Sequence, residues 1–243
     1  MLPRICIPSY NRSDTINLKT LKFLRSVDYP TDKIYIFVAS ELDQFRYSLT
    51  CPGCQIILGV PGLKPQRRFI QDFLDEGEIY IGMDDDVQGI KSLKPFLQII
   101  RDGVQTIESR RTGLFGILPK DDARCFKDDT TEHLSFILGS FFICRNHKEI
   151  LLEGSCLTDD FERSLLYFKK YGKIYRYRGA GVQTRYSGTS ENTRDNFTER
   201  KRDAVLGLVK RFPDICVYRD KNGEPDILLN WRAKTISDEW WYY

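Results

Sequence analysis

Three consecutive carboxylates follow an apolar run in the first half of the chain. Residues 79–83 have the composition of a buried strand, and Asp84, Asp85 and Asp86 come directly after it. Adjacent like charges repel one another, so a fold that places them beside a core has to neutralise them. Mg²⁺ and Mn²⁺ are suited to this, because they prefer oxygen ligands and keep coordination positions open for phosphate oxygens. The spacing therefore indicates an enzyme that acts on a nucleoside diphosphate.

An acidic turn and a calcium-binding loop are the two alternatives for this run. The EF-hand loop alternates its ligands and has a glycine at its sixth position, and that pattern is absent here. A divalent cation would stabilise a departing diphosphate, on which negative charge grows as the sugar–oxygen bond breaks.

A basic cluster lies shortly before the carboxylates. Lys64, Arg67 and Arg68 precede or open a predicted helix over residues 66–74. The free N–H groups and the positive dipole end at a helix N-terminus favour anions, so a diphosphate would bind well there. A solvated basic surface is the alternative.

The elements that have to position these side chains alternate between strand and helix. We predict strands and helices at 4–7 (strand), 13–27 (helix), 33–40, 56–60 (strands), 66–74 (helix) and 79–83 (strand). This rhythm predicts an α/β fold with a mostly parallel central sheet flanked by helices. Ligands of such sheets bind beyond the carboxyl ends of the strands. The polar segments that follow the strands are expected to converge there: 9–12, 40–41, 61–68 and 84–86.

The second half of the chain is less regular. We predict a helix at 95–106, strands at 114–118 and 136–144, a helix opening at 158, short strands at 173–178 and 182–186, a basic helix at 190–211 and a hairpin at Asn222-Gly223. We expect one domain over residues 1–215, in which 1–90 form the donor-nucleotide half and 91–215 the acceptor half. Residues 216–243 are expected to form a C-terminal extension packed on it.

The overall composition is that of an ordinary globular protein. Of 243 residues, 41% are hydrophobic and 29% charged, and the net charge of +3 neither demands nor excludes a nucleic-acid partner. The seven cysteines come without a secretory leader, and no stretch approaches the roughly 20 apolar residues of a membrane span. These features predict a soluble cytoplasmic protein without membrane contact. Cys51-Pro-Gly-Cys54 lacks a second ligand pair and is expected to be a turn.

Several motifs together resemble a known enzyme family. The run Cys6-Ile-Pro-Ser-Tyr-Asn-Arg12 after the first strand, combined with the Asp84–Asp86 turn, resembles GT-A-type glycosyltransferases. With Gly59–Leu63 and Gln66–Ile70 added, the set resembles the TET-associated glycosyltransferases, phage enzymes linked to sugar modification of 5-hydroxymethylcytosine in DNA. The resemblance covers most of residues 4–190. It implies a GT-A-like (Rossmann-like) sheet with a smaller acceptor-side β element, a UDP-sugar donor and Mn²⁺ or Mg²⁺.

The resemblance also implies positions for the donor and the metal. It places Pro8, Tyr10 and Arg12 around the uracil and ribose, with Glu41 near the base. Tyr10 does offer a stacking face and Arg12 a fork for phosphate, although a turn that feeds a capped helix is the alternative. The first aspartate of such runs tends towards the ribose and the last towards the metal. Asp86 is thus the main expected metal ligand, Asp84 the supporting one, and Asp85 part of the donor site.

One feature of the sequence bears on the metal ligands. Many GT-A enzymes add a late histidine to the metal, but the only histidines here, His133 and His147, both precede residue 160. Either the metal has fewer protein ligands, or Arg185 and its neighbours Tyr186 and Ser187 stabilise the diphosphate instead.

Asp159 and Asp160 open a predicted helix where inverting GT-A enzymes carry an acidic base. Such a carboxylate takes the proton from an acceptor hydroxyl, with Asp160 preferred over Asp159. Helix capping is the alternative, and a configuration-retaining enzyme would need no base.

The acceptor is the least constrained part of the prediction. We expect 5-hydroxymethylcytosine in DNA, which requires basic surface. The candidate surface residues are Arg110, Arg111, Lys169, Lys170, Lys173, Arg176, Arg178, Arg194, Arg200, Lys201 and Arg202. A polysaccharide, glycolipid or protein acceptor is the alternative, and a non-catalytic DNA-binding relative is a further one.

Overall fold

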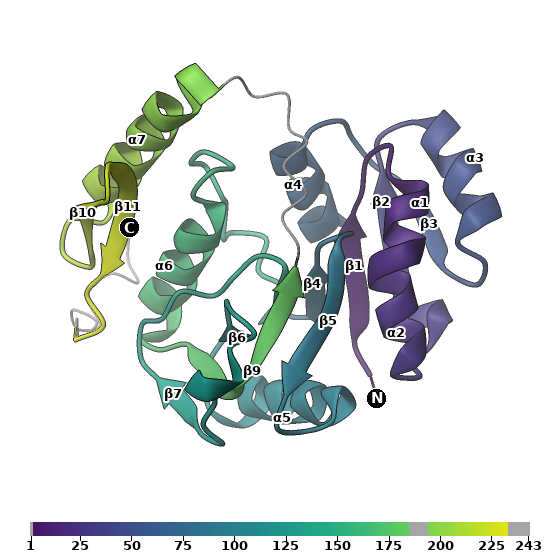
Figure 1. Ribbon diagram of the computed structural model, residues 1–243, viewed down its shortest axis with the longest axis horizontal. Helices are drawn as coiled ribbons and strands as arrows, with labels where there is room; N and C mark the ends of the chain where they lie inside the picture. Colours follow the sequence, from purple (N-terminus) through teal and green to yellow (C-terminus); the bar gives the residue numbers. More distant parts are fainter. Residues whose placement is uncertain (1, 185–193, 233–243) are drawn as a thin grey trace.

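The computed structural model describes residues 2–184 and 194–232. Its centre is a sheet whose first strands are all parallel and lie in the order β3-β2-β1-β4. Their bounds are Arg4–Pro8 (β1), Ile34–Val38 (β2), Gln55–Leu58 (β3) and Ile79–Met83 (β4). In parallel strands the carboxyl ends share one edge, so the loops after these strands meet there (Figure 1).

The second half of the chain extends this sheet beyond β4 with β8, β6, β9 and β5 in that order, while β7 pairs with β9. Their bounds are Val87–Ser92 (β5), Leu114–Leu118 (β6), Thr130–Glu132 (β7), Phe141–Arg145 (β8) and Tyr175–Thr184 (β9). Strands β6 and β9 run in the direction of β4, whereas β5, β7 and β8 run against it. The mostly parallel sheet is therefore confirmed within the described residues.

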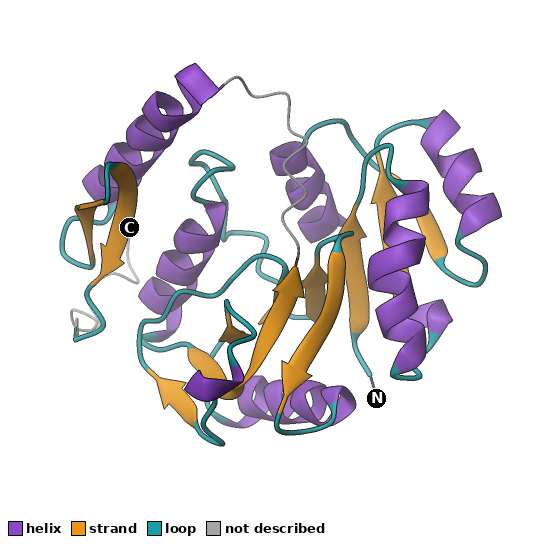
Figure 2. Cartoon of the chain, viewed as in Figure 1, coloured by secondary structure: helices purple, strands orange, loops and turns teal. Residues whose placement is uncertain are grey.

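Helices cover both faces of the sheet (Figure 2). One face carries α1 (Ser13–Ile16), the π-helical segment η1 (Asn17–Leu21), α2 (Lys22–Ser26), α3 (Glu41–Thr50) and α5 (Phe96–Ser109). The other carries α4 (Leu63–Phe73), α6 (Asp159–Tyr171) and α7 (Arg194–Arg211). A separate hairpin of β10 (Cys216–Lys221) and β11 (Glu224–Leu229) packs on α7.

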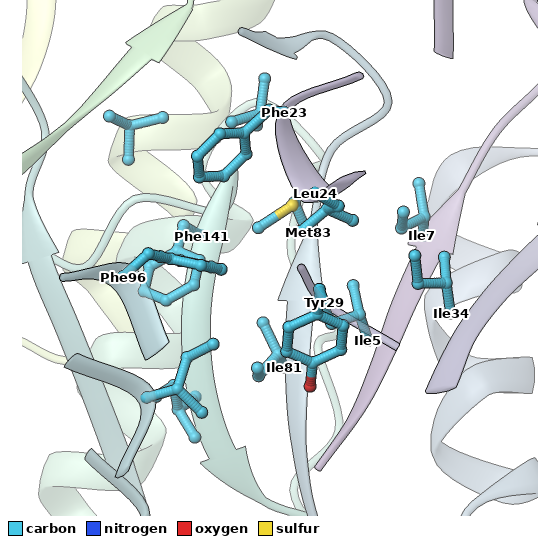
Figure 3. Packing of buried hydrophobic residues seen from close by; sticks show 14 of the residues in the cluster. Ile5, Ile7, Phe23, Leu24, Tyr29, Ile34, Ile81, Met83, Phe96 and Phe141 are labelled. Atoms are coloured by element: carbon cyan, nitrogen blue, oxygen red, sulfur yellow. The ribbon is translucent and has the colours of Figure 1, made fainter. Parts of the chain in front are cut away.

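The two hydrophobic cores follow from the alternation of side chains along the strands. Ile81 and Met83 of β4 join the core under α2 and α5, while Tyr80 joins the core under α4 and α6. Figure 3 shows the first of these cores, in which Phe23 packs edge-on against Phe96 with ring centroids 5.0 Å apart.

Most predicted elements are present, with some differences. The strands at 79–83 and 114–118 have the predicted bounds, and the hairpin turn at Asn222-Gly223 has the positive φ angles of 58° and 83° that favour this pair. The strand predicted at 136–144 begins only at Phe141, and the strands at 173–178 and 182–186 are one continuous strand, β9. Helix α3 and the strands β5 and β7 were not predicted.

Two further observations concern the chain as a whole. All seven cysteines fall within the described ranges and are free thiols. None of the helices in residues 2–184 and 194–232 has the length and apolar character needed to cross a bilayer.

Candidate active site

Asp85 holds the loop after β1 against the turn after β4. Its carboxylate accepts a hydrogen bond of 2.6 Å from Ser9 Oγ and one of 3.1 Å from Arg12 Nη1. Tyr47 of α3 completes the network, because its hydroxyl lies 2.7 Å from Ser9 Oγ and accepts the Arg12 backbone N–H at 2.9 Å. The Asp85 side chain is buried and fully engaged. Each of its oxygens has a protein partner, so Asp85 supports the two loops and is the least available of the three carboxylates for a metal.

Asp84 is held differently. Its backbone carbonyl accepts a hydrogen bond from Thr20 Oγ1 at 2.9 Å, and its carboxylate lies 3.9 Å from Arg67 Nη2. The pKa of Asp84 is raised to about 6, chiefly by burial; Arg67 opposes the rise, and the carboxylates of Asp160, Asp86 and Asp85 add to it. Arg67 therefore compensates only part of the effect of burial and of the three neighbouring carboxylates on Asp84.

The carboxylate of Asp86 differs from those of Asp84 and Asp85 in its contacts. It is half-buried, and among the described residues no hydrogen bond or ion pair engages its side chain. A free carboxylate two residues from Asp84, at the end of a strand, offers the oxygen that a hard cation requires. Mg²⁺ and Mn²⁺ are commonly held by one or two carboxylates together with substrate phosphates. The pair Asp84 and Asp86 fits such an ion.

Arg67 connects the β4 turn to the start of α6. This buried side chain of α4 pairs with Asp159 as well as with Asp84. Burial lowers the pKa of Arg67, and the neighbouring Arg163 lowers it further. With both aspartates as partners the guanidinium stays charged, so Arg67 joins the donor side of the site to the acidic helix terminus.

Asp160 is the more accessible member of the α6 pair. Its side chain is 23% exposed against 11% for Asp159, and its Oδ1 lies 3.6 Å from Arg163 Nη1. A β-carbon on Gly139 would lie 2.2 Å from the same oxygen, so the carboxylate occupies the space that this glycine leaves open. Arg163 in turn stacks over the Phe142 ring at 4.1 Å. Asp160 is therefore held in one position but remains partly exposed to solvent, whereas Asp159 is paired with Arg67.

The other predicted donor residues are placed as follows. Pro8 ends β1, Tyr10 is 68% exposed in the loop after it, and Glu41 is the first residue of α3. Because β1 and β2 are neighbours, these loops lie at the same edge as the aspartates. Arg185 lies outside the described residues.

Lys64 and Arg68 contact the segment before α6 instead of the aspartates. Lys64 Nζ donates to the carbonyl of Glu153, and Arg68 pairs with Asp72 at 3.0 Å and donates to the carbonyl of Lys148. Of the three basic residues at this helix, the structure brings only Arg67 to the carboxylates.

A cavity of about 40 Å³ lies between α4, the sheet and α6, and its lining includes Arg67, Asp84 and Arg163 beside mostly apolar side chains. It has room for water molecules and is far below the roughly 300 Å³ that a small-molecule site needs. The cavity is therefore too small to hold a nucleotide sugar.

A second group of possible metal ligands consists of Glu76, His147 and Glu149. Both ring nitrogens of His147 are engaged, Nδ1 with Glu76 at 2.7 Å and Nε2 with the Tyr171 hydroxyl at 2.5 Å. Glu149 pairs with Lys170 at 2.6 Å. These partners satisfy the group without a metal, so it is an ion-pair network that joins α6 to the loop after β8.

Sequence reasoning did not assign roles to Ser9, Tyr47 or Arg163. Arg163 follows Asp159 and Asp160 at the i+4 and i+3 spacings that bring helical side chains together, so helix geometry could have identified it. Ser9 and Tyr47 meet Asp85 only through the tertiary fold.

Several solved structures resemble this fold. The chain superposes on a mannosyl-3-phosphoglycerate synthase from Rubrobacter xylanophilus with a TM-score of 0.56 and 10% identity, over 93% of this chain and 86% of that one. For a glucosyl-3-phosphoglycerate synthase from Mycobacterium tuberculosis, solved with Mg²⁺ and UDP, the TM-score is 0.53 at 12% identity, over 94% and 86%. The fold is that of the GT-A-type glycosyltransferases.

A mannosyltransferase from Pyrobaculum calidifontis, solved with GDP-mannose and Mn²⁺, gives a TM-score of 0.50 at 15% identity over 88% of this chain. The present chain spans 65% of the length of that enzyme, less than two thirds. No protein-family model matches the sequence, and no curated protein matches it either. At these identities the likeness establishes the GT-A fold, and the chemistry has to be argued from the residues of this chain.

Proposed function

We propose that this protein is a metal-dependent glycosyltransferase that moves a sugar from a UDP-sugar to a hydroxyl acceptor. The observation that carries the proposal is the unengaged carboxylate of Asp86 beside Asp84, at the carboxyl end of β4 in a GT-A fold. Solved structures of this fold hold UDP with Mg²⁺ and GDP-mannose with Mn²⁺. A metal and a nucleotide-sugar donor are therefore consistent with the position and the chemistry of this pair.

The three aspartates would divide the work. Asp86 and Asp84 would hold Mn²⁺ or Mg²⁺, which when bound supplies Lewis-acid stabilisation of the departing diphosphate. Asp85 keeps the β1 loop in position through Ser9 and Arg12, so that Pro8, Tyr10 and Arg12 can surround the nucleoside, with Glu41 from the neighbouring loop. Arg67 adds a positive charge next to Asp84, on the diphosphate side.

Asp160 would serve as the base. In the transfer, the acceptor oxygen forms a bond to the anomeric carbon, its proton passes to the Asp160 carboxylate, and the bond between that carbon and the diphosphate oxygen breaks. UDP leaves with the bonding electrons. Asp160 is favoured over Asp159 because it is the more exposed of the two and is not paired with Arg67.

The chemical class of the acceptor is a separate part of the proposal. The sequence resemblance favours 5-hydroxymethylcytosine in DNA, in which the hydroxymethyl oxygen would be the nucleophile. Two of the three similar structures are 3-phosphoglycerate synthases and the third is a mannosyltransferase, which supports the alternative of an acceptor outside DNA better.

One assay tests the donor and the acceptor together. Radiolabelled UDP-glucose or UDP-N-acetylglucosamine would be incubated with the protein and Mn²⁺, in separate reactions with hydroxymethylated DNA, unmodified DNA, oligosaccharides and 3-phosphoglycerate. We expect label transfer to one acceptor, lost with EDTA. Mass spectrometry of the nucleosides would identify a glycosylated 5-hydroxymethylcytosine. DNA binding without UDP binding or any transfer would instead indicate a non-catalytic relative and contradict the proposal.

A further inference from the structure

Four large apolar side chains are exposed on two helical segments of the first half of the chain. On α3, Leu42, Phe45 and Leu49 are 58%, 62% and 67% exposed, and Leu18 of η1 is 72% exposed. We call these four side chains the apolar face. Single exposed leucines are common on protein surfaces, but a group on neighbouring elements is typical of an interaction surface.

The two segments that carry the apolar face lie side by side. The side-chain amide of Asn17 donates a hydrogen bond of 2.6 Å to the backbone carbonyl of Thr50, and Arg46 Nη1 donates one of 3.3 Å to Asn11 Oδ1. Both segments cover the same face of the sheet, next to β1, β2 and β3 (Figure 1). Their outer sides therefore form one surface.

The hydrophobic core does not require the apolar face. Positions 42, 45 and 49 have the i, i+3, i+7 spacing of one side of a helix, and the opposite side, with the buried Asp43 and Tyr47, faces the sheet. In η1 the buried residues are Thr20 and Leu21. The core is closed by these inner sides, so folding does not explain why the outer sides are apolar.

Basic side chains surround the apolar face, and we call them the basic rim. Its members are Lys19, Lys22, Arg25 and Arg46. None of them forms an ion pair with a carboxylate in residues 2–184 and 194–232; Arg25 and Arg46 donate only to asparagine side chains. Stretches 15–26 and 42–50 contain a single carboxylate, that of Asp43, which is buried. The surface therefore combines apolar side chains with an uncompensated positive charge.

An anionic bilayer surface fits this combination better than the other partners do. In a symmetric dimer the surface would meet itself, and the basic rims of the two copies would repel each other. A nucleic acid would neutralise the cations but would place leucine and phenylalanine against phosphates. Anionic lipid headgroups attract the cations, while leucine and phenylalanine enter the boundary between the headgroups and the acyl chains.

We propose that the apolar face and the basic rim bind the surface of an anionic phospholipid membrane, with α3 and η1 lying in the plane of the headgroups. Side chains of such helices reach only about 5–10 Å into the bilayer, so the contact needs no membrane-spanning segment. The sequence prediction of no membrane contact considered only runs long enough to span a bilayer. This inference goes beyond the transferase proposal and does not rest on it.

Flotation of the protein with lipid vesicles tests the proposal. Vesicles of phosphatidylcholine with about 30% phosphatidylserine are compared with vesicles of phosphatidylcholine alone. We expect the anionic vesicles to bind the protein more tightly, and about 1 M salt to abolish this preference, because it screens charges beyond roughly 3 Å. Leu18→Ser/Leu49→Ser should weaken binding about tenfold or more. Lys22→Gln/Arg25→Gln should weaken it about tenfold for the anionic vesicles only.

Matched control variants change exposed side chains elsewhere on the chain. Leu206→Ser/Leu228→Ser replaces two exposed leucines of α7 and β11, and Arg202→Gln/Lys210→Gln removes two exposed cations of α7. Both should bind the anionic vesicles as wild type does. All four variants should melt near the wild-type temperature in circular dichroism, because each changed side chain is exposed or at a helix surface.

Two vesicle results would overturn the proposal. One is the absence of a preference for anionic vesicles in the wild type. The other is binding by Leu18→Ser/Leu49→Ser and Lys22→Gln/Arg25→Gln that is no weaker than that of their controls. Analytical ultracentrifugation adds a third test: a wild-type dimer that Leu18→Ser/Leu49→Ser converts to a monomer would assign the surface to a second copy of the chain and contradict the membrane assignment.

A parallel titration with UDP and Mn²⁺ keeps this inference separate from the proposed function. The surface variants should bind UDP as wild type does, because the proposed metal and diphosphate ligands are unchanged in them. If wild type binds UDP but shows no preference for anionic vesicles, only the membrane assignment fails. If wild type prefers anionic vesicles but does not bind UDP, only the transferase proposal fails.

Discussion

Ser9 Oγ donates a hydrogen bond of 2.6 Å to the carboxylate of Asp85, across 76 positions of sequence. Asp85 is the middle member of an acidic run, yet it is the one turned into the protein. Because its oxygens are taken by Ser9 and Arg12, only the flanking carboxylates of Asp84 and Asp86 remain for the metal site that we propose. These bonds thus fix the β1 loop against the turn that carries Asp84 and Asp86.

The first prediction concerns this bond. Asp85→Ala leaves Ser9 and Arg12 without their acceptor, so the free energy of unfolding should fall by about 1–3 kcal/mol. Urea denaturation followed by circular dichroism measures the change. Asp32→Ala, at an exposed aspartate of the turn before β2, is the control and should stay within about 0.5 kcal/mol of wild type. Equal stability of the two variants would show that the Asp85 network contributes nothing.

The second prediction concerns Arg67 and Asp159. Arg67→Met leaves the buried Asp159 carboxylate without its partner, and we expect a loss of about 3 kcal/mol in the free energy of unfolding. Adding Asp159→Asn should recover part of this loss, since it removes the unpaired charge. A double-mutant cycle measures the coupling, and additive losses would contradict the pairing.

The third prediction concerns Gly139, the glycine beside the proposed base Asp160. An alanine β-carbon at Gly139 would lie 2.2 Å from Asp160 Oδ1, and the carboxylate has to rotate away. We expect kcat to fall about tenfold or more, because a small misplacement of a catalytic group is costly, while the affinity for UDP is unchanged.

Gly207→Ala is the matched control for that substitution. It lies in α7 with open space around its β-carbon position. It should leave kcat unchanged and raise stability by up to about 1 kcal/mol. Full activity of Gly139→Ala would argue against Asp160 as the base.

The fourth prediction concerns the chemistry of Asp160 itself. Asp160→Asn keeps the shape of the side chain but cannot accept the proton, so kcat should fall about 10²–10⁴-fold with the KM for the donor little changed. Proton NMR of the product should show that the configuration at the anomeric carbon has been inverted. A product that retains the donor configuration would remove the need for a base and would refute this role.

The sequence was informative about local elements and strand ends. Apolar runs bounded by turn residues located β4 and β6 to the residue, and the placement of polar segments after parallel strands correctly anticipated that 9–12, 40–41 and 84–86 lie at one edge. The sequence was less informative about strands that are stabilised mainly by pairing with a neighbouring strand. Strand β5 (VQGIKS) has little apolar character of its own and exists because it pairs with β9.

The site could be predicted only as far as residue type and position along the chain allow. Lys64, Arg67 and Arg68 are equivalent in the sequence, and tertiary packing alone decides that Arg67 reaches Asp84 and Asp159. Similarly, only the folded chain distinguishes the buried Asp85 from the unengaged Asp86.

The central claim is that Asp86 binds the metal that holds the donor diphosphate. Isothermal titration of UDP into wild type and Asp86→Asn, with and without Mn²⁺, tests it most directly, with the exposed Asp75→Asn as control. We predict that Mn²⁺ tightens UDP binding by about tenfold or more in wild type and in Asp75→Asn, and that Asp86→Asn loses this gain. Undiminished Mn²⁺-dependent UDP binding by Asp86→Asn would contradict the account.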